Sequence, residues 1–311
     1  MKGRAQALLL ALLLDRALGD PPNRWHPVAW MGGAIARAQR RAPAAGRGRP
    51  FAYGFALVAG GSALAAGIGR VLGASITRMP AGPGLLAEAL ALKMMLSLRG
   101  LLAAGDEIEK ALAVDDLPAA QKALSWHLVS RPTAGLVKSQ VAAATIESLT
   151  ENSSDGAIAP LFFYAMGGLP AALAYRFINT ADAMLGYRDE AREWLGKAPA
   201  RLDDLANFIP ARLSALLLLA ASPLVGLDGG RGWRVWRRDA HLTDSPNAGH
   251  PMSAAAGALG VELSKTGQYR LGAGQRDARG QDIAQAIRLV RAAVWLGASA
   301  LTALLFLRGQ R

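Results

Sequence analysis

Long runs of apolar residues without charge dominate the pattern along this chain. Residues 51–69 and 157–175 contain no charged side chain, and residues 292–307 form another uncharged run between two arginines. A shorter run covers residues 213–227. Because a helix needs about 20 mostly apolar residues to cross a bilayer, this pattern predicts an all-α, polytopic membrane protein. We expect a single integral-membrane domain over 1–311, with apolar segments at about 51–77, 84–104, 157–175, 213–227 and 292–307.

Several of these segments do not have the pattern of a simple span. Residues 84–104 form an apolar helix with three charged residues, which favours burial against protein or a place at the interface. The run 157–175 contains Gly167–Pro170, which should break it near its middle. Irregular backbone at membrane depth needs shielding by protein. We therefore expect 157–175 to be re-entrant or buried, with 213–227, interrupted by Ser-Pro, as the next candidate.

Composition and charge support a membrane protein and exclude several kinds of site. The chain is 52% hydrophobic but only 6% aromatic, and small residues allow helices to pack closely in lipid. With no cysteine, disulfides, iron–sulfur clusters and thiolate zinc sites are excluded, and the four histidines lack metal-ligand spacing. The net charge of +12 is concentrated in residues 1–50 and 228–291. A positive-inside bias explains this distribution more simply than nucleic-acid binding, which we do not expect.

The first polar block is Glu147–Gly156, directly before an apolar run. Glu147, Glu151 and Asp155 recur every four residues, which places them on one face of a helix. Three stacked carboxylates repel one another unless a bound cation neutralises their charge. Mg²⁺ is a suitable cation because it prefers oxygen ligands. The alternative is a solvated acidic face capped by Asn152 and its neighbours.

The second block runs from Asn179 to Arg212. Asp203 and Asn207 share a helical face, and Asp204 lies beside them. Carboxylates for a metal ion together with arginines for phosphate are what phosphoryl chemistry needs. Asp182 could add a ligand. A network of interfacial ion pairs at a helix end is the other interpretation.

Two shorter pieces complete the candidate chemistry. In Asp244–Pro251, the side chains of Ser245 and Asn247 and the backbone of Gly249 could hold an anion, although such a sequence also suits an ordinary turn. Proline pairs around His26 predict a rigid turn, in which a lone histidine is more often structural than catalytic. Neither the P-loop nor the dinucleotide-binding glycine motif is present.

The chain resembles the CobD/CbiB family, the membrane-bound adenosylcobinamide-phosphate synthases of cobalamin biosynthesis. The resemblance is collinear over nearly the whole chain. It rests on GDPP at 19–22 with the following His-Pro-Val, ENSSDG at 151–156, NTADAMLGYRDE at 179–190, ARLDDLANFIPARL at 200–213 and SPNAG at 245–249. The family often continues SPNAG with an aromatic residue, Pro and Glu, where this chain has His-Pro-Met.

The resemblance implies an ATP-dependent ligase in the cell (inner) membrane, with its active site on the cytoplasmic face. The reaction joins a propionate carboxyl of adenosylcobyric acid, a corrinoid, to aminopropanol or its O-phosphate, with Mg²⁺ and ATP as cofactors. Other cobalamin-assembly membrane enzymes would be compatible partners. We expect catalysis by Glu151, Asp155, Asp203 and Asp204, and metal binding by Glu147, Glu151, Asp155, Asp182, Asp203 and Asp204. Expected substrate or phosphate contacts are His26, Asn152, Ser154, Asn179, Arg201, Asn207, Arg212, Ser245, Asn247 and Gly249.

Three other classes of protein remain as alternatives. An intramembrane, Mg²⁺-dependent prenyltransferase would use the Asp-Asp-x-x-Asn pattern at 203–207, but its second such motif is missing. A CDP-alcohol phosphotransferase needs an arginine that is absent after Asp155-Gly156. A non-enzymatic transporter or assembly subunit would explain intramembrane polar residues, but not three blocks that combine acids and arginines.

Overall fold

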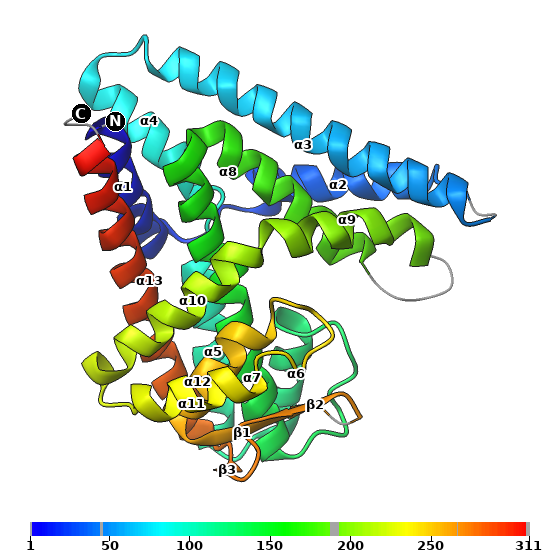
Figure 1. Cartoon of the computed structure of the whole chain (residues 1–311), viewed down its shortest axis with the longest axis vertical. Helices are drawn as coiled ribbons and strands as arrows, with labels where there is room; N and C mark the ends of the chain where they lie inside the picture. The colour runs from blue at the N-terminus through cyan, green and yellow to red at the C-terminus, as the bar shows by residue number, and fades with distance from the viewer. Residues whose placement is uncertain (1, 44–45, 187–192, 266, 309–311) are drawn as a thin grey trace. The chain divides into compact units, whose positions relative to one another are not determined.

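The computed structural model describes residues 2–43, 46–186, 193–265 and 267–308, and it is mostly helical (Figure 1). Within these ranges, four helical segments are long and apolar enough to cross a membrane: Gly48–Ile76, Lys138–Leu185, Phe208–Val225 and Gly280–Arg308. This confirms the predicted all-α, polytopic membrane fold.

The contacts between residues divide the chain into two compact units, each assembled from separate stretches of sequence. Unit 1 contains residues 1–97, 159–207 and 298–311, and unit 2 contains 98–158 and 208–297. A single integral-membrane domain stays a prediction.

Unit 1 is built on the long helix α3 (Gly48–Ile76). This helix packs against α8 (Ala159–Leu185) and α9 (Glu193–Ala206). The crossing with α9 is close because Gly54 has no side chain: a Cβ there would lie 2.0 Å from the carbonyl oxygen of Leu195. The remaining described helices of the unit are α1 (Lys2–Leu18), the short η1 (Asn23–Trp25), α2 (Pro27–Gln39), α4 (Ala81–Lys93) and the end of α13 (Gly280–Arg308) from residue 298. Helix α1 packs on α4.

The predicted break in the apolar run 157–175 is confirmed. Gly168 has φ 70° and ψ −159°, which is not helical, and Pro170 cannot donate a backbone hydrogen bond. Figure 1 shows the ribbon of α8 turning sharply within the helix. The apolar window in Lys138–Leu185 is 61% buried, against 17% in α3, so this segment is packed against protein. A re-entrant course stays a prediction.

The prediction of one helix over 84–104 is wrong. Helix α4 ends at Lys93, and α5 (Leu98–Ala113) begins after a short turn. Lys93 is buried, and its ammonium group donates to the carbonyl of Gly19 and lies 3.4 Å from Asp20. A buried charge must find polar partners, and Lys93 finds them just beyond the end of α1.

Unit 2 is centred on α7 (Lys138–Ser153), whose residues 141–150 are all buried. It packs against α5, α6 (Leu117–His127), α12 (Gly249–Leu259) and β1 (Val261–Lys265). The other described elements are η2 (Ser154–Ile158), α10 (Phe208–Ala221), η3 (Ser222–Val225), α11 (Gly229–Asp239), β2 (Tyr269–Leu271), β3 (Arg276–Asp277) and the part of α13 (Gly280–Arg308) up to residue 297.

A small sheet in unit 2 was not predicted from the sequence. Strand β1 pairs with β2 in antiparallel fashion, with Leu263 opposite Leu271, and with β3 in parallel fashion. The alternation typical of a strand covers only four residues of β1. Val261 and Leu263 are buried, while Glu262 and Ser264 are not. Strands β1 and β2 form a hairpin, and the packing of β1 on α7 brings residues of the second half of the chain against that helix.

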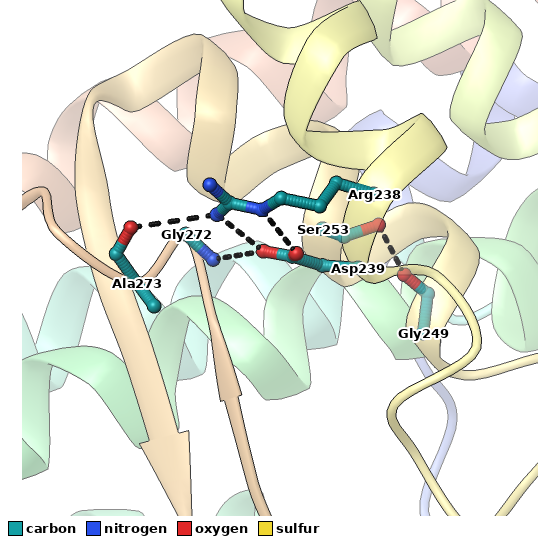
Figure 2. A network of polar contacts seen from close by, with 6 residues as sticks. All are labelled: Arg238, Asp239, Gly249, Ser253, Gly272 and Ala273. Carbon is teal, nitrogen blue, oxygen red and sulfur yellow. Dashed lines mark hydrogen bonds and ion pairs between the residues drawn. The ribbon is translucent and has the colours of Figure 1, made fainter.

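A buried carboxylate fixes the hairpin to the end of α11 (Figure 2). Asp239 is 2% exposed and accepts hydrogen bonds from the backbone N–H of Gly272 at 2.6 Å and from the guanidinium of Arg238 at 2.6 and 2.9 Å. Burial alone would raise the pKa of Asp239, but Arg238 and the Gly272 N–H together hold it below its usual value. Arg238 also donates to the carbonyl of Ala273, at 3.4 Å.

Candidate functional site

A buried carboxylate on α7 is the centre of the candidate site in unit 2. Glu147 is 5% exposed, and its Oε1 atom has no hydrogen-bond partner among the described residues. The hydroxyl of Ser154, 3% exposed, is likewise unpartnered within the described part of the chain. Ser154 begins a π-helical turn, a local widening often found at functional sites. Buried polar atoms without partners point to a ligand that supplies them.

The groups facing Glu147 come from segments distant in sequence. The hydroxyl of Tyr269 on β2 donates a hydrogen bond to Glu147, and the charges of Arg131 and Lys265 act on the same carboxylate. Burial, and then the negative charges of Glu147 and Glu151, raise the pKa of Tyr269, so this phenol remains a donor. Nothing in the sequence pattern indicates Tyr269, Arg131 or Lys265. Lys265 and Tyr269 reach Glu147 only because β1 and β2 pair and β1 packs on α7.

The predicted metal ligands of the first block do not form a closed metal centre. No three acidic or histidine side chains converge to hold an ion anywhere in the described ranges. Mg²⁺ is often bound by one or two carboxylates together with phosphate oxygens and water. The unpartnered oxygen of Glu147, with Glu151 one turn away, is compatible with such an ion. The metal site stays a prediction, because no set of three ligands converges in the described ranges.

The other residues of the first block lie around this carboxylate with varied exposure. Glu151 and Asp155 are half-buried. Asn152 is also half-buried, and its side-chain amide donates to the carbonyl of Ser148 at 2.9 Å. Asn152 therefore stabilises the end of α7 as well as lying in the block.

The third block forms a compact loop before α12. The hydroxyl of Ser245 accepts from the backbone N–H groups of Asn247 and Ala248, at 3.2 and 3.3 Å, so it shapes the loop itself. Gly249 is buried, and a Cβ there would lie 2.2 Å from the carbonyl oxygen of Ala240. The loop is thus closely packed against the end of α11.

Arg212 joins the end of the second block to the third. Its guanidinium donates to the side-chain oxygen of Asn247 at 3.3 Å and to the carbonyl of Phe208 at 2.7 Å. It also lies 3.7 Å from the centre of the Phe208 ring. Because α10 packs against both η2 and α12, the first and third blocks and Arg212 belong to the same packed region of unit 2.

His250 supports this loop as a neutral imidazole. Its Nδ1 accepts from the indole N–H of Trp236 at 2.9 Å, and the ring also contacts the backbone of Pro246. Burial and then the charge of Arg212 lower the pKa of His250 to about 4. Protonation would place a second donor against the Trp236 N–H and disrupt the loop.

Acidification is therefore expected to destabilise unit 2 through His250. The folded protein binds this proton more weakly than the unfolded chain, so stability is full above the ordinary pKa of 6.5 and is lost as pH falls toward 4. Thermal unfolding in detergent, followed between pH 7 and 4, should show a decline that is smaller in His250→Asn, which keeps an acceptor but does not titrate. An equal decline in both proteins would contradict this role.

The rest of the second block forms a separate polar network in unit 1. Asp203 is 9% exposed, and its two oxygens accept from the amides of Asn179, at 3.3 Å, and Asn207, at 2.9 Å. Asn207 in turn accepts from the hydroxyl of Tyr175, at 2.9 Å. Burial raises the pKa of Asp203, while the two asparagines act in the opposite direction. This network is well satisfied by protein groups alone.

The remaining predicted residues of unit 1 are either partly exposed to solvent or bonded to nearby residues of the chain. Arg201 has a 73% exposed side chain and lies 3.5 Å from Asp204, while Asp182 is half-buried near the end of α8. His26 caps α2 by accepting from the Val28 N–H at 3.2 Å, and its Nε2 lies 3.7 Å from Asp20. The neighbouring His26 is the main cause that lowers the pKa of Asp20. Both ring nitrogens of His26 thus have structural contacts.

Comparison with known proteins places nearly the whole chain in one family. The model of the family described as "CobD/Cbib protein" matches residues 8–295. A cobalamin biosynthesis protein CobD of Dehalococcoides mccartyi is 41% identical over 290 residues, covering 93% of this chain and 94% of the relative. CobD of Geobacter metallireducens is 43% identical over 267 residues, 84% and 82% of the two chains. The cobalamin biosynthesis protein CbiB of Salmonella typhimurium is 36% identical over 315 residues, 96% and 95%.

No solved structure matches this chain. The family match extends over the blocks in both units, from the first turn after α1 to the loop before α12. The names of these relatives, which are cobalamin biosynthesis proteins, agree with the pathway that the sequence motifs implied. The chain therefore belongs to the CobD/CbiB family of cobalamin biosynthesis proteins.

Proposed function

We propose that this protein is an ATP-dependent ligase that joins a propionate carboxyl of adenosylcobyric acid to aminopropanol or its O-phosphate. The observation that carries the proposal is the buried Glu147 carboxylate, with one unpartnered oxygen, among Glu151, Arg131 and Lys265. Acidic groups for a cation and basic groups for phosphate lie together there. Family membership supports a corrinoid substrate.

The reaction needs activation because a carboxylate is a poor electrophile for an amine. Transfer of the terminal phosphoryl group of ATP to a propionate oxygen gives an acyl phosphate and ADP. The amine nitrogen then attacks the acyl carbon, the C–O bond to phosphate breaks, and inorganic phosphate leaves. The ammonium proton must first pass to a base, a role for which the half-buried Asp155 is suited.

The residues of unit 2 supply binding and charge for these steps. Arg131, Lys265 and Arg212 provide positive charge for phosphate groups. Glu147 and Glu151 would hold Mg²⁺, which neutralises developing charge on the phosphoryl oxygens. Burial around Glu147 excludes water, and this would protect the acyl phosphate from hydrolysis.

The prenyltransferase alternative has less support. In that class, Asp203 would bind Mg²⁺ and a diphosphate, but both of its oxygens accept hydrogen bonds from asparagine side chains. A metal ion would have to displace these donors.

Amide formation by the purified protein tests the proposal directly. The detergent-solubilised protein is incubated with adenosylcobyric acid, Mg²⁺-ATP and either aminopropanol or its O-phosphate. We expect an amidated corrinoid by mass spectrometry and ADP in equal amount. ATP hydrolysis without amidation, or no dependence on the corrinoid acid, would contradict the proposal.

The two predicted phosphate-binding arginines should behave differently. Arg212 is held by Asn247 and by the Phe208 ring, whereas Arg201 is largely exposed. Lysine keeps the charge but loses the planar fork of donors. We expect Arg212→Lys to raise the Michaelis constant for ATP or the phosphorylated amine by about tenfold, the equivalent of one charge-assisted hydrogen bond, and Arg201→Lys to have a smaller effect. Steady-state kinetics measure both, and a silent Arg212→Lys would remove Arg212 from phosphate binding.

We also propose that the blocks face the cytoplasm of a cell whose inner membrane holds the protein. The basic segments 1–50 and 228–291 support this orientation. The chain has no cysteine, so single cysteines at the exposed positions Ser130, Arg201 and Asp244 report topology cleanly. All three should react with a membrane-impermeant thiol reagent in inverted vesicles but not in intact cells. Labelling of any position from outside would contradict a shared cytoplasmic face.

A further inference from the structure

Unit 1 contains an apolar groove that the proposed reaction does not use. It has a volume of about 490 Å³ and lies between α2, α3, α8 and the end of α4. Every residue lining it is apolar, including Trp30, Met31, Leu64, Ile68, Met94 and Phe177.

The lining excludes the polar substrates of the reaction. Nucleotides, amino alcohols and the amide-bearing rim of a corrinoid need hydrogen-bond partners when they are buried. The one polar atom of the Trp30 side chain, its indole N–H, already donates to the carbonyl of Arg24 at 2.9 Å. The groove therefore suits a hydrocarbon chain. Its methionines, Met31, Met94 and Met95, form a wall that adapts to a flexible ligand.

The groove opens on a helix face that the bilayer must cover. Helix α3 is a candidate span with only 17% of its apolar window buried. Leu64 and Ile68 line the groove and are 66% and 53% exposed. The groove is thus continuous with the lipid-facing surface of α3, and acyl chains have direct access to it.

A basic and aromatic cluster at the start of α2 fits the head group of the same lipid. Arg24 is exposed, and its guanidinium lies 5.8 Å from the centre of the Trp25 ring, which is itself 61% exposed. Trp30 is 57% exposed and connects this cluster to the groove through its bond to Arg24. Tryptophan and arginine concentrate at the membrane interface, where phosphate groups lie.

We infer that this groove binds one bilayer phospholipid, with an acyl chain between α2 and α3 and its phosphate beside Arg24. The inference is independent of the proposed reaction. The lipid would be retained more firmly than the surrounding bilayer lipids, because its chain is held between α2, α3, α4 and α8 instead of against a single helix.

Lipid retention with matched variants tests this site. Ala34 lines the groove and is exposed, so Ala34→Phe fills the groove without entering the core. Ala63→Phe adds the same bulk to an exposed position of α3 outside the lining. After extensive washing in detergent, native mass spectrometry should detect one phospholipid on the wild-type protein and on Ala63→Phe. Ala34→Phe should lose at least about nine-tenths of it, which for a site that is almost full in the wild type corresponds to a loss of affinity of about a hundredfold.

Two further arms exclude simpler explanations. A phospholipid with a photoreactive group in its acyl chain should label Met31 and Met94 in the unmodified protein. Arg24→Gln should reduce retention of phospholipid but not of diacylglycerol, which lacks the phosphate, and added inorganic phosphate should not compete. Equal retention by Ala34→Phe and the wild type, equal loss in Ala63→Phe, or labelling confined to the outer face of α3 would overturn the site.

Discussion

Replacing Glu147 or Glu151 with Gln is expected to lower corrinoid amidation by a factor of about 100 or more. Each change keeps the shape of the side chain and removes one charge from the region where Mg²⁺ and phosphate are proposed to bind. Tyr269→Phe removes only the hydroxyl that donates to Glu147 and should cause a smaller loss. The turnover number of purified, folded variants measures the effect.

Asp106→Asn is the matched control for these variants. Asp106 is an exposed acid of α5 in the same unit, paired with Lys110 on the surface. Surface pairs contribute little to stability, so this variant should retain both fold and activity. Near wild-type turnover in Glu147→Gln would show that the buried carboxylate has no part in catalysis.

Gly249→Ala is expected to cause the largest loss of stability among single substitutions in the third block. A Cβ at this position would lie 2.2 Å from the carbonyl oxygen of Ala240 and 2.8 Å from the hydroxyl of Thr243. The loop or the start of α12 must move to admit it, at a cost of about 3 kcal/mol. Because the same loop holds Asn247 beside Arg212, amidation should fall as well.

Gly135→Ala provides the comparison within unit 2. Nothing lies within 4 Å of a Cβ at Gly135, so this variant should unfold within a degree or two of the wild type. Thermal unfolding in detergent, followed by intrinsic fluorescence, measures both proteins. If Gly249→Ala unfolded at the same temperature as Gly135→Ala, the close packing of the loop would be contradicted.

The apolar pattern predicted the fold class and most long helices, because a membrane-spanning helix can be recognised from the length of its apolar run. It also predicted the break in α8, since Gly167–Pro170 contains both a residue that allows positive φ and one that cannot donate. The end of α4 at Lys93 was missed. The apolar pattern continues past it, and the partners that make a turn favourable there lie more than seventy residues earlier.

The candidate site was predictable only as far as its residues are local in sequence. Glu147, Glu151 and Asp155 share a helical spacing that can be read directly. Tyr269 cannot be found this way, because it faces Glu147 through the pairing of β1 with β2 and the packing of β1 on α7. The second block is contiguous in sequence, yet Asn207 and Arg212 belong to different units.

The interleaving of the two units has a consequence for synthesis on the ribosome. Residues 1–97 emerge first but need both 159–207 and 298–311 to complete their unit, while 98–158 must wait for 208–297. Neither unit can finish folding before the other is partly made, so the growing chain exposes unfinished apolar faces for most of translation. Residues 98–158 therefore wait without their partners in this interval, and a chain truncated near residue 158 would contain neither unit in complete form.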